Sequence, residues 1–386
     1  MPYAWLTGHQ KYGTYLKLML PLNNTLSNLT PLTSGCNGPL QMTFEDQINI
    51  LVYFHLEEHH SGRRLLQVLK EDYFARQYIA PEKGIQKSSF FEDISSRELE
   101  QMVELFGKLY IQAANQIPKG YAELSDLVII DGSLIEAVLS MYWAVYRDGS
   151  KKAKVHIGFD LNRGIPKKIF LSDGKEAERP FVSRILAPGE TGIMDRGYQS
   201  HKLFDIWQAD DKHFICRIKA STGKTIIRKN DVQPGSIVFY DAIVLLGTSG
   251  INQTEREVRV VGYQVDGVNY WIATDRLDLT AEKIAFAYKL RWNIEIFFGW
   301  WKRHLKMYHL ISRSQYGLMV QIMAGLITYL LLAIFCYNQH QENVSVKRLR
   351  EICIKIRNEM SLTDIVNGTG LWVYQPPDLV NLHASL

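Results

Sequence analysis

Apolar residues recur at helical spacing over the first third of the chain. Thr43 precedes the run FEDQINILVYFHLEEH, whose apolar positions repeat every three or four residues, and a second such run, RRLLQVLKED, follows it. A longer amphipathic stretch covers residues 85–117. These patterns predict an N-terminal helical domain over residues 1–125. With Lys83 and Lys87 between them, short helices of this kind favour either a helix-turn-helix-like DNA-binding unit or a plain helical bundle.

From residue 126 the pattern changes to short apolar runs typical of strands. The run LVIID ends in an acid at Asp131, and VHIGFDL and IPKKIFLSD read as a β-hairpin around Asn162, Arg163 and Gly164. A strand ending at Asp195, a helix over residues 200–208 and the strand HFICRI come next. A strand, a hairpin, then strand–helix–strand is the order of an RNase H-like α/β core. The predicted fold class is therefore α/β, an RNase H-like mixed sheet with flanking helices.

A β-rich segment follows that core at about residues 220–275. It contains SIVFYDAIVLL, EREVRVVGYQV and VNYWIATD, and the last two are joined across Asp266 and Gly267, which are turn residues. We interpret this segment as an insertion within a catalytic domain that covers residues 126–340. Residues 341–386 are predicted to form a C-terminal helix and a loop-rich tail.

Residues 318–337 form a continuous apolar stretch in which only Gln321 and Thr328 are clearly polar. Twenty such residues are enough to span a bilayer. A central helix buried on all sides has the same composition. Because no second stretch of this kind exists in the sequence, we interpret it as a buried core helix and expect no membrane association.

Composition narrows the class of protein but does not identify a partner. The chain is 46% hydrophobic and 22% charged, which is typical of a folded globular protein. A net charge of +4 is compatible with a polyanionic partner without indicating one. The chain lacks a basic, apolar leader and any CxxC pair, so we expect a cytoplasmic protein in which its four cysteines are reduced. Those cysteines are Cys36, Cys216, Cys336 and Cys353.

The stretch AYKLRWNIEIFFGWWKRHLK carries the most informative chemistry. On one continuous helix, its Tyr, Arg, Glu and Lys positions fall within a stripe of about 60°, behind an aromatic apolar face. A solvated helix can carry mixed charges, but a lone carboxylate between cations also suits metal and phosphate binding. The stripe consists of Tyr288, Arg291, Glu295, Lys302 and Lys306.

The spacing of Tyr288, Arg291, Glu295 and Lys302 resembles the Tyr-Arg-Glu-Lys signature of DDE transposases of insertion sequence family four. Two further motifs support this resemblance. The sequence Ile-Asp-Gly-Ser around Asp131 resembles the first acid of that family, at the end of the first strand. The sequence Asp-Arg-Gly-Tyr, which begins at Asp195, resembles its second acid. The resemblance covers roughly residues 125–340.

The resemblance implies a role for each of these residues. Asp131, Asp195 and Glu295 would be the catalytic residues and would hold two Mg²⁺ ions, with Mn²⁺ able to substitute. Other side chains would bind DNA; they are Tyr288, Arg291, Lys302, Arg196 and Trp271. Some relatives flip a base onto an aromatic ring, for which Tyr270 or Trp271 is the candidate, although both could equally be strand core.

The function implied is metal-dependent cleavage at the terminal inverted repeats of a transposon, followed by strand transfer into target DNA. We expect a homodimer in the synaptic complex and a cytoplasmic, nucleoid-associated enzyme. Two alternatives remain. One is an RNase H-like nuclease that uses the same acids without strand transfer, and the other is an inactive DNA-binding relic of a mobile element.

Other chemistry-bearing residues carry weaker signals. His55 to His59 fits the HxxEH pattern of zinc peptidases, but no third ligand is evident, and we interpret both histidines as surface residues at a helix end. A basic cluster beside the hairpin either contacts DNA or is a solvated turn; it comprises Lys151, Lys152 and Lys154. Five other acids could replace one of the three proposed: Glu136, Asp160, Asp173, Glu176 and Glu178. Of these, Glu136 is expected to begin the segment after the first strand.

Overall fold

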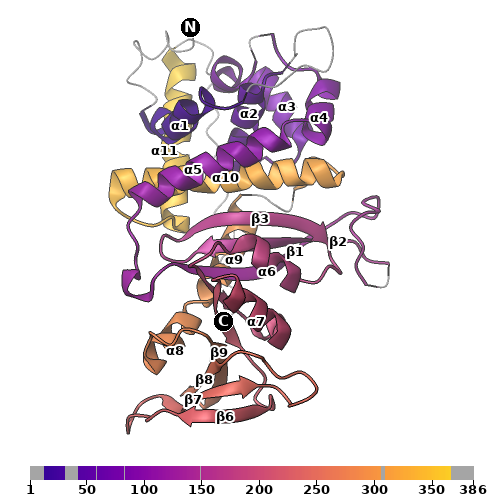
Figure 1. Ribbon diagram of the computed structural model, residues 1–386. Coiled ribbons are helices and arrows are strands. Elements are labelled where there is room, and N and C mark those ends of the chain that lie inside the picture. The colour runs from indigo at the N-terminus through magenta and orange to yellow at the C-terminus, as the bar shows by residue number, and fades with distance from the viewer. Residues whose placement is uncertain are drawn as a thin grey trace, which may run out of the picture.

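The computed structural model describes residues 13–30, 42–57, 59–81, 83–147, 149–305 and 309–366, with the side chains of residues 360–366 left aside. Three layers are visible in Figure 1: a helical layer, a central sheet, and a β extension at the opposite end. The helices are α1 (Gly13–Leu26), α2 (Phe44–Leu56), α3 (Gly62–Glu71), η2 (Ala75–Ile79), α4 (Lys87–Ser96), α5 (Leu99–Gln116), η3 (Ala122–Leu124), α6 (Arg179–Ile185), η4 (Arg196–Tyr198), α7 (His201–Ala209), α8 (Ala281–Lys289), α9 (Trp292–His304), α10 (Gln315–His340) and α11 (Val346–Val366). The strands are β1 (Leu127–Glu136), β2 (Lys152–Asp160), β3 (Ile165–Asp173), β4 (Thr191–Met194), β5 (His213–Arg217), β6 (Lys224–Lys229), β7 (Val238–Leu246), β8 (Val258–Val265) and β9 (Val268–Thr274).

The strands form one mixed sheet in the order β3-β2-β1-β4-β5-β9-β8-β7-β6. Strands β1, β4 and β5 are parallel, while β2 and β3 form the antiparallel hairpin beside β1. The first five positions are the strand order of an RNase H-like core. The predicted fold class, α/β with a mixed sheet, flanking helices and N-terminal helices, is confirmed.

The β-rich segment continues this sheet. Strand β9 pairs antiparallel with β5, and β8, β7 and β6 follow outward as a meander. The β8–β9 connection is the predicted two-residue turn, in which Asp266 and Gly267 have φ of 49° and 76°. Positive φ at both positions gives the backbone twist that a two-residue hairpin needs. The segment therefore lengthens the sheet between β5 and α8.

Strand β1 is longer than its apolar run indicated, which corrects the expectation that it ends at Asp131. It continues to Glu136 because β2 pairs with it over the whole length, ending with Glu136 opposite Lys152. An ion pair of 2.6 Å joins these last two side chains. The expectation that Glu136 begins the following segment is also wrong. Asp131 thus lies in the middle of a strand.

Helix α10 is the core helix of the molecule. Its length and composition would also suit a membrane span, but 94% of its most apolar window is buried inside the structure. It packs against α5, α2, α4 and α1 on one side and against β3 on the other. In Figure 1 it runs between the N-terminal helices and the sheet. The interpretation as a buried helix is confirmed.

The N-terminal helices begin at the polar residues that the sequence provides. Thr43 forms a capping box with Asp46 at the start of α2, and Ser61 accepts a hydrogen bond from the Arg64 amide at the start of α3. Their apolar faces share one core with α10 and the sheet. The division into residues 1–125, 126–340 and 341–386 stays a prediction. Cys36, the tail beyond residue 366 and Lys306 lie outside the described residues.

The stretch around Arg291 is not one continuous helix, as the stripe assumed. Helix α8 ends at Lys289 and α9 begins at Trp292. At the junction the amides of Asn293 and Ile294 bond the carbonyls of Leu290 and Arg291, three residues back, so the turn is tighter than α-helix. This break changes the direction in which residues after Arg291 project relative to Tyr288.

Candidate active site

Asp131 and Asp195 lie side by side because of the strand register. Parallel strands β1 and β4 pair Ile129 with Ile193, so the two acids come at the same level, two residues further along each chain. Neighbouring strands lie about 4.8 Å apart, and residues two positions apart share a face. Ile129 and Ile193 belong to the core on the α9 side of the sheet. Both carboxylates are therefore directed to that side.

Each aspartate is fixed by an amide close to it in the chain. The Gly132 amide donates to Asp131 Oδ1 at 2.8 Å, and the Gly197 amide donates to Asp195 Oδ1 at 2.8 Å. A Cβ at Gly197 would come 3.0 Å from Asp195 Oδ1, so a glycine at this position avoids a close contact with the carboxylate. The bond from Gly132 favours the ionised form of Asp131.

Arg291 links Glu295 to Asp131. Its Nη1 lies 3.2 Å from Asp131 Oδ2 and its Nη2 lies 2.5 Å from Glu295 Oε1. The guanidinium therefore bridges a carboxylate of the sheet and a carboxylate of α9, which are 164 residues apart in the sequence by their numbers, 131 and 295. Its planar fork of donors suits such a bridge. Two acids far apart in the sequence, Asp131 and Glu295, thus share one cation.

The site concentrates negative charge where water has little access. Burial raises the pKa of Asp131 from its ordinary 3.8 to about 7; Arg291 and the Gly132 amide oppose this, while Asp195 and Glu178 add to it. Burial also holds the pKa of the Tyr198 phenol well above its usual value, and the charges of Glu178, Asp131 and Asp195 raise it further. A carboxyl in such surroundings gains from any added positive charge.

Two residues in this cluster were not assigned a role from the sequence. Tyr198 is fully buried beneath the acids. Glu178 was only one of several spare acids, yet a Cβ at Gly132 would come 2.8 Å from its Oε1. The available signals were the Tyr of the Asp-Arg-Gly-Tyr motif and the glycine after Asp131. Neither reveals that Glu178, at the start of α6, folds back onto β1.

The residues expected to bind DNA lie around the acids at different distances. The Tyr288 ring lies 6.3 Å from that of Tyr270, which Arg217 covers at 4.8 Å. Burial raises the pKa of Tyr288. Lys302 donates to the Leu134 carbonyl at 2.6 Å, and burial lowers the pKa of its ammonium group.

The two remaining residues, Arg196 and Trp271, have other surroundings, although Arg196 directly follows Asp195 in the chain. Arg196 is exposed in η4 and lines a separate hollow with Arg179 and Lys202. Trp271 packs edge-on against Phe239 and Tyr240, at 5.3 Å and 5.1 Å between ring centroids. Because side chains alternate along β9, Tyr270 projects to the face of Tyr288 and Trp271 to the other face. Of these two aromatic residues, Tyr270 is the one in contact with the signature residues.

The donor set suits a hard divalent cation in its chemistry. Carboxylate oxygens are the ligands that Mg²⁺ prefers. Within the described ranges, no three His, Cys, Asp or Glu side chains lie close enough to hold an ion together. The positive charge between Asp131 and Glu295 is the guanidinium of Arg291.

The histidine pattern is part of the core, so the expectation of surface histidines is wrong. His55 is fully buried, with its Nδ1 2.5 Å from the Leu305 carbonyl oxygen and its Nε2 3.3 Å from that of Gln321, and His59 is 9% exposed. Burial lowers the pKa of both histidines to about 4. Both therefore remain neutral, and His55 links α2 to the end of α9 and to α10, while His59 packs against Tyr53 and Phe54.

The lysines beside the hairpin do not act as one cluster. Lys152 pairs with Glu136, Lys151 reaches the Tyr142 carbonyl at 3.4 Å, and Lys154 lies 3.4 Å from Glu178. Only Lys154 faces the region of the acids.

Comparisons with known proteins agree on one family. A family described as the transposase DDE domain matches residues 123–331, which is more than half of this chain. A Sinorhizobium fredii protein named as a transposase is 27% identical over 246 residues, 62% of this chain and 68% of the relative. A transposase of insertion sequence element IS5377 from Geobacillus stearothermophilus is 25% identical over 209 residues, 53% of this chain; the match spans only 55% of that relative. One for element IS4SA from a Synechocystis strain is 24% identical over 254 residues, 63% of this chain and 69% of the relative.

Among solved structures, a piggyBac transposase synaptic complex with hairpin DNA matches with a TM-score of 0.46 and 11% identity, over 95% of this chain and 87% of that one. The resemblance inferred from the three motifs is confirmed by the family and the relatives. Because the match to the transposase DDE domain extends over more than half of its length, this chain belongs to that family.

Proposed function

We propose that this transposase cuts DNA at the terminal inverted repeats of its element and joins the freed end to target DNA, with Asp131, Asp195 and Glu295 as its catalytic residues. One observation carries the proposal. Asp131 and Asp195 lie in register, two residues beyond the last pair between the neighbouring strands β1 and β4, and Arg291 bonds both Asp131 and Glu295 of α9. Carboxylates that converge from distant segments against the cost of burial indicate a functional site.

DDE transposases generally use divalent metal ions. Our finer proposal is two Mg²⁺ ions, replaceable by Mn²⁺, held by Asp131, Asp195 and Glu295. When bound, such ions activate a hydroxyl nucleophile and stabilise charge on the leaving oxygen. The side chains prepare this chemistry, because Asp131 has a pKa of about 7 and is ionised more fully as positive charge accumulates around it.

The cations around the acids would bind and orient DNA. Arg291 has donors on both edges of its guanidinium and would exchange its carboxylates for backbone phosphate oxygens when DNA arrives. Lys302 and Arg196 would contact phosphates, and Tyr288 would donate its hydroxyl to one. A flipped base would stack on Tyr270 or Trp271, and the contact between Tyr270 and Tyr288 favours the former.

The proposed partners follow from this chemistry. The substrate is DNA, and two ends must be held together for joining, which favours a homodimer in the synaptic complex. We also propose that residues 1–125 contribute DNA contacts and that the enzyme works in the cytoplasm at the nucleoid.

The experiment uses a labelled duplex that carries the repeat flanking the gene, with Mg²⁺ and a target plasmid. Wild type should cleave next to the repeat and join the end to the plasmid. Glu295→Gln should bind the duplex and leave it intact, while the exposed control Glu123→Gln should behave as wild type. Cleavage without joining would favour the nuclease, and binding without cleavage by wild type would favour the relic.

A further inference from the structure

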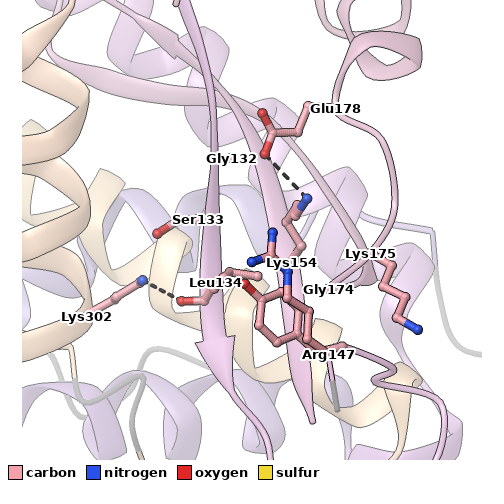
Figure 2. A pocket seen from close by; sticks show the side chains of 10 residues that line it. Gly132, Ser133, Leu134, Arg147, Lys154, Gly174, Lys175, Glu178 and Lys302 are labelled. Carbon is pink, nitrogen blue, oxygen red and sulfur yellow. Dashed lines mark hydrogen bonds and ion pairs between the residues drawn. The ribbon is translucent and has the colours of Figure 1, made fainter. Parts of the chain in front are cut away.

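A cavity of about 570 Å³ begins one residue beyond Asp131. Its wall on β1 is formed by Gly132, Ser133 and Leu134, and Lys302 approaches it from α9. Figure 2 shows the remaining side chains arriving from β2, from the turn after β3 and from the loop before β2. Glu178 also lines the cavity, and a Cβ at Gly132 would come 2.8 Å from its Oε1. The cavity therefore adjoins the catalytic cluster.

The lining is strongly cationic. Four of its side chains carry positive charge and one, Glu178, carries negative charge; the cations are Arg147, Lys154, Lys175 and Lys302. Lys154 lies 3.4 Å from Glu178 and donates to the Glu176 carbonyl at 2.9 Å. Arg147 and Lys175 are exposed and form no ion pair with a carboxylate in the described part of the chain. The cavity thus carries a surplus of positive charge at its open side.

The backbone is shaped to keep this cavity open. A Cβ at Gly174 would come 2.7 Å from the Tyr146 ring and 2.8 Å from the Lys152 carbonyl, so the ring packs directly on the glycine. Arg147 lies 5.6 Å from the centroid of that ring. On the other side, Asp173 accepts the Lys175 amide at 2.8 Å and fixes the turn that presents Lys175. Arg147 therefore extends from a packed aromatic residue, and Lys175 extends from a hydrogen-bonded turn.

We propose that this cavity binds the sugar–phosphate backbone of one DNA strand beside the scissile phosphate, with Arg147 and Lys175 contacting successive phosphates. The inference rests on the proposed function and adds a subsite to it. An anionic chain suits a site that offers guanidinium and ammonium donors and one carboxylate that is already paired. The volume exceeds that of a single phosphate group and lies in the range of nucleotide-sized ligands. Because Gly132, which lines the cavity, directly follows Asp131, a DNA strand bound there would lie next to the proposed reacting phosphate.

The strand has two possible sources, the transposon end or the target. Both present the same backbone chemistry, and the experiment separates them. Binding is measured first for the labelled end duplex without divalent metal, across a salt series. Capture of a supercoiled target plasmid by the complex already assembled on pre-cleaved ends is measured second.

The test variant is the double substitution Arg147→Ala with Lys175→Ala, and the matched control is Lys347→Ala with Lys355→Ala, two exposed lysines of α11. Each lost phosphate contact lowers the slope of log affinity against log salt by about 0.7–0.9. The test variant should therefore lose about 1.4–1.8 from the slope for one of the two DNAs, and the control should keep the wild-type slope. Lys175→Glu, which adds a repulsive charge, should weaken the same step more than Lys175→Ala.

A reduced slope for the end duplex assigns the cavity to the transposon end, and a reduced slope only in plasmid capture assigns it to the target. Wild-type slopes for both DNAs in the test variant, with an enzyme that still cleaves and joins, would overturn the cavity proposal and leave the proposed function intact. Failure of wild type itself to bind either DNA would overturn both. Because Arg147 and Lys175 are exposed, far-ultraviolet circular dichroism should show the test variant folded as wild type.

Discussion

Replacing Asp131 by asparagine should make this protein more stable while removing its proposed chemistry. The side chain is only 19% exposed, and its carboxyl lies near Asp195 and Glu178. Asparagine keeps the shape of the group and an oxygen that can accept the Gly132 amide, but it carries no charge. The substitution therefore removes the free-energy cost of burying a carboxylate, and it also removes the ion pair with Arg291.

The size of the effect follows from the pKa. A rise from the ordinary 3.8 to about 7 corresponds to roughly 4 kcal/mol between the two protonation states, with the opposing effect of Arg291 already included. Well below pH 4, Asp131 is protonated in the folded and the unfolded chain and contributes nothing. Between pH 4 and pH 7 only the unfolded chain releases its proton, so the free energy of unfolding falls as pH rises. At pH 8 the full penalty is present.

Urea unfolding of wild type and Asp131→Asn in a chelator, at pH 4 and pH 8, measures this difference. The variant should be more stable by up to about 4 kcal/mol at pH 8 and within about 1 kcal/mol of wild type at pH 4. The exposed control Asp231→Asn should shift neither value. A variant that is equally or less stable than wild type at pH 8, or whose advantage does not depend on pH, would refute this account of the site.

Three further changes test other parts of the structure. Arg291→Met removes the cation between two carboxylates, and urea unfolding should show that the free energy of unfolding falls by up to about 3 kcal/mol at pH 8. The loss should be smaller at pH 5, where the Asp131 carboxyl is protonated. An equal loss at both pH values would contradict the bridge. Leu330→Ala, at a fully buried position of α10, should cost about 2–5 kcal/mol by the same assay, and a cost under 1 kcal/mol would mean that α10 is less tightly packed than described. Asp241→Ala removes the carboxylate that accepts two hydrogen bonds, of 2.9 Å and 2.7 Å, from the buried guanidinium of Arg259. Calorimetry should report that the free energy of unfolding falls by about 3–5 kcal/mol, and an unchanged value would mean that this pair does not stabilise the β extension.

The sequence predicted those parts of the fold that depend on local chemistry. The hairpin around Asn162, the turn at Asp266 and Gly267, and the cap at Thr43 all form where turn and capping residues occur. The order of strands and helices was enough to infer the RNase H-like core. The apolar stretch that became α10 was interpreted correctly because no second stretch of its kind exists.

Long-range pairing and local breaks were beyond the sequence pattern. The apolar run ends near Asp131, but β2 continues to pair with β1 as far as Glu136, and only the partner strand determines that. Helical periodicity did not reveal the tight turn at Leu290 and Arg291, because both residues suit a helix. The closeness of Glu178 and Tyr198 to Asp131 depends on how α6 and η4 pack, which spacing along the chain does not encode.

The central claim is that Asp131, Asp195 and Glu295 form one metal-dependent centre that acts on DNA. The most direct measurement compares wild type with Asp131→Asn, Asp195→Asn and Glu295→Gln, recording repeat-end binding and strand cleavage in the same samples as Mg²⁺ is added. The account predicts that all four proteins bind the end and that only wild type cleaves it. Cleavage by any of the three variants at the wild-type rate would contradict the claim.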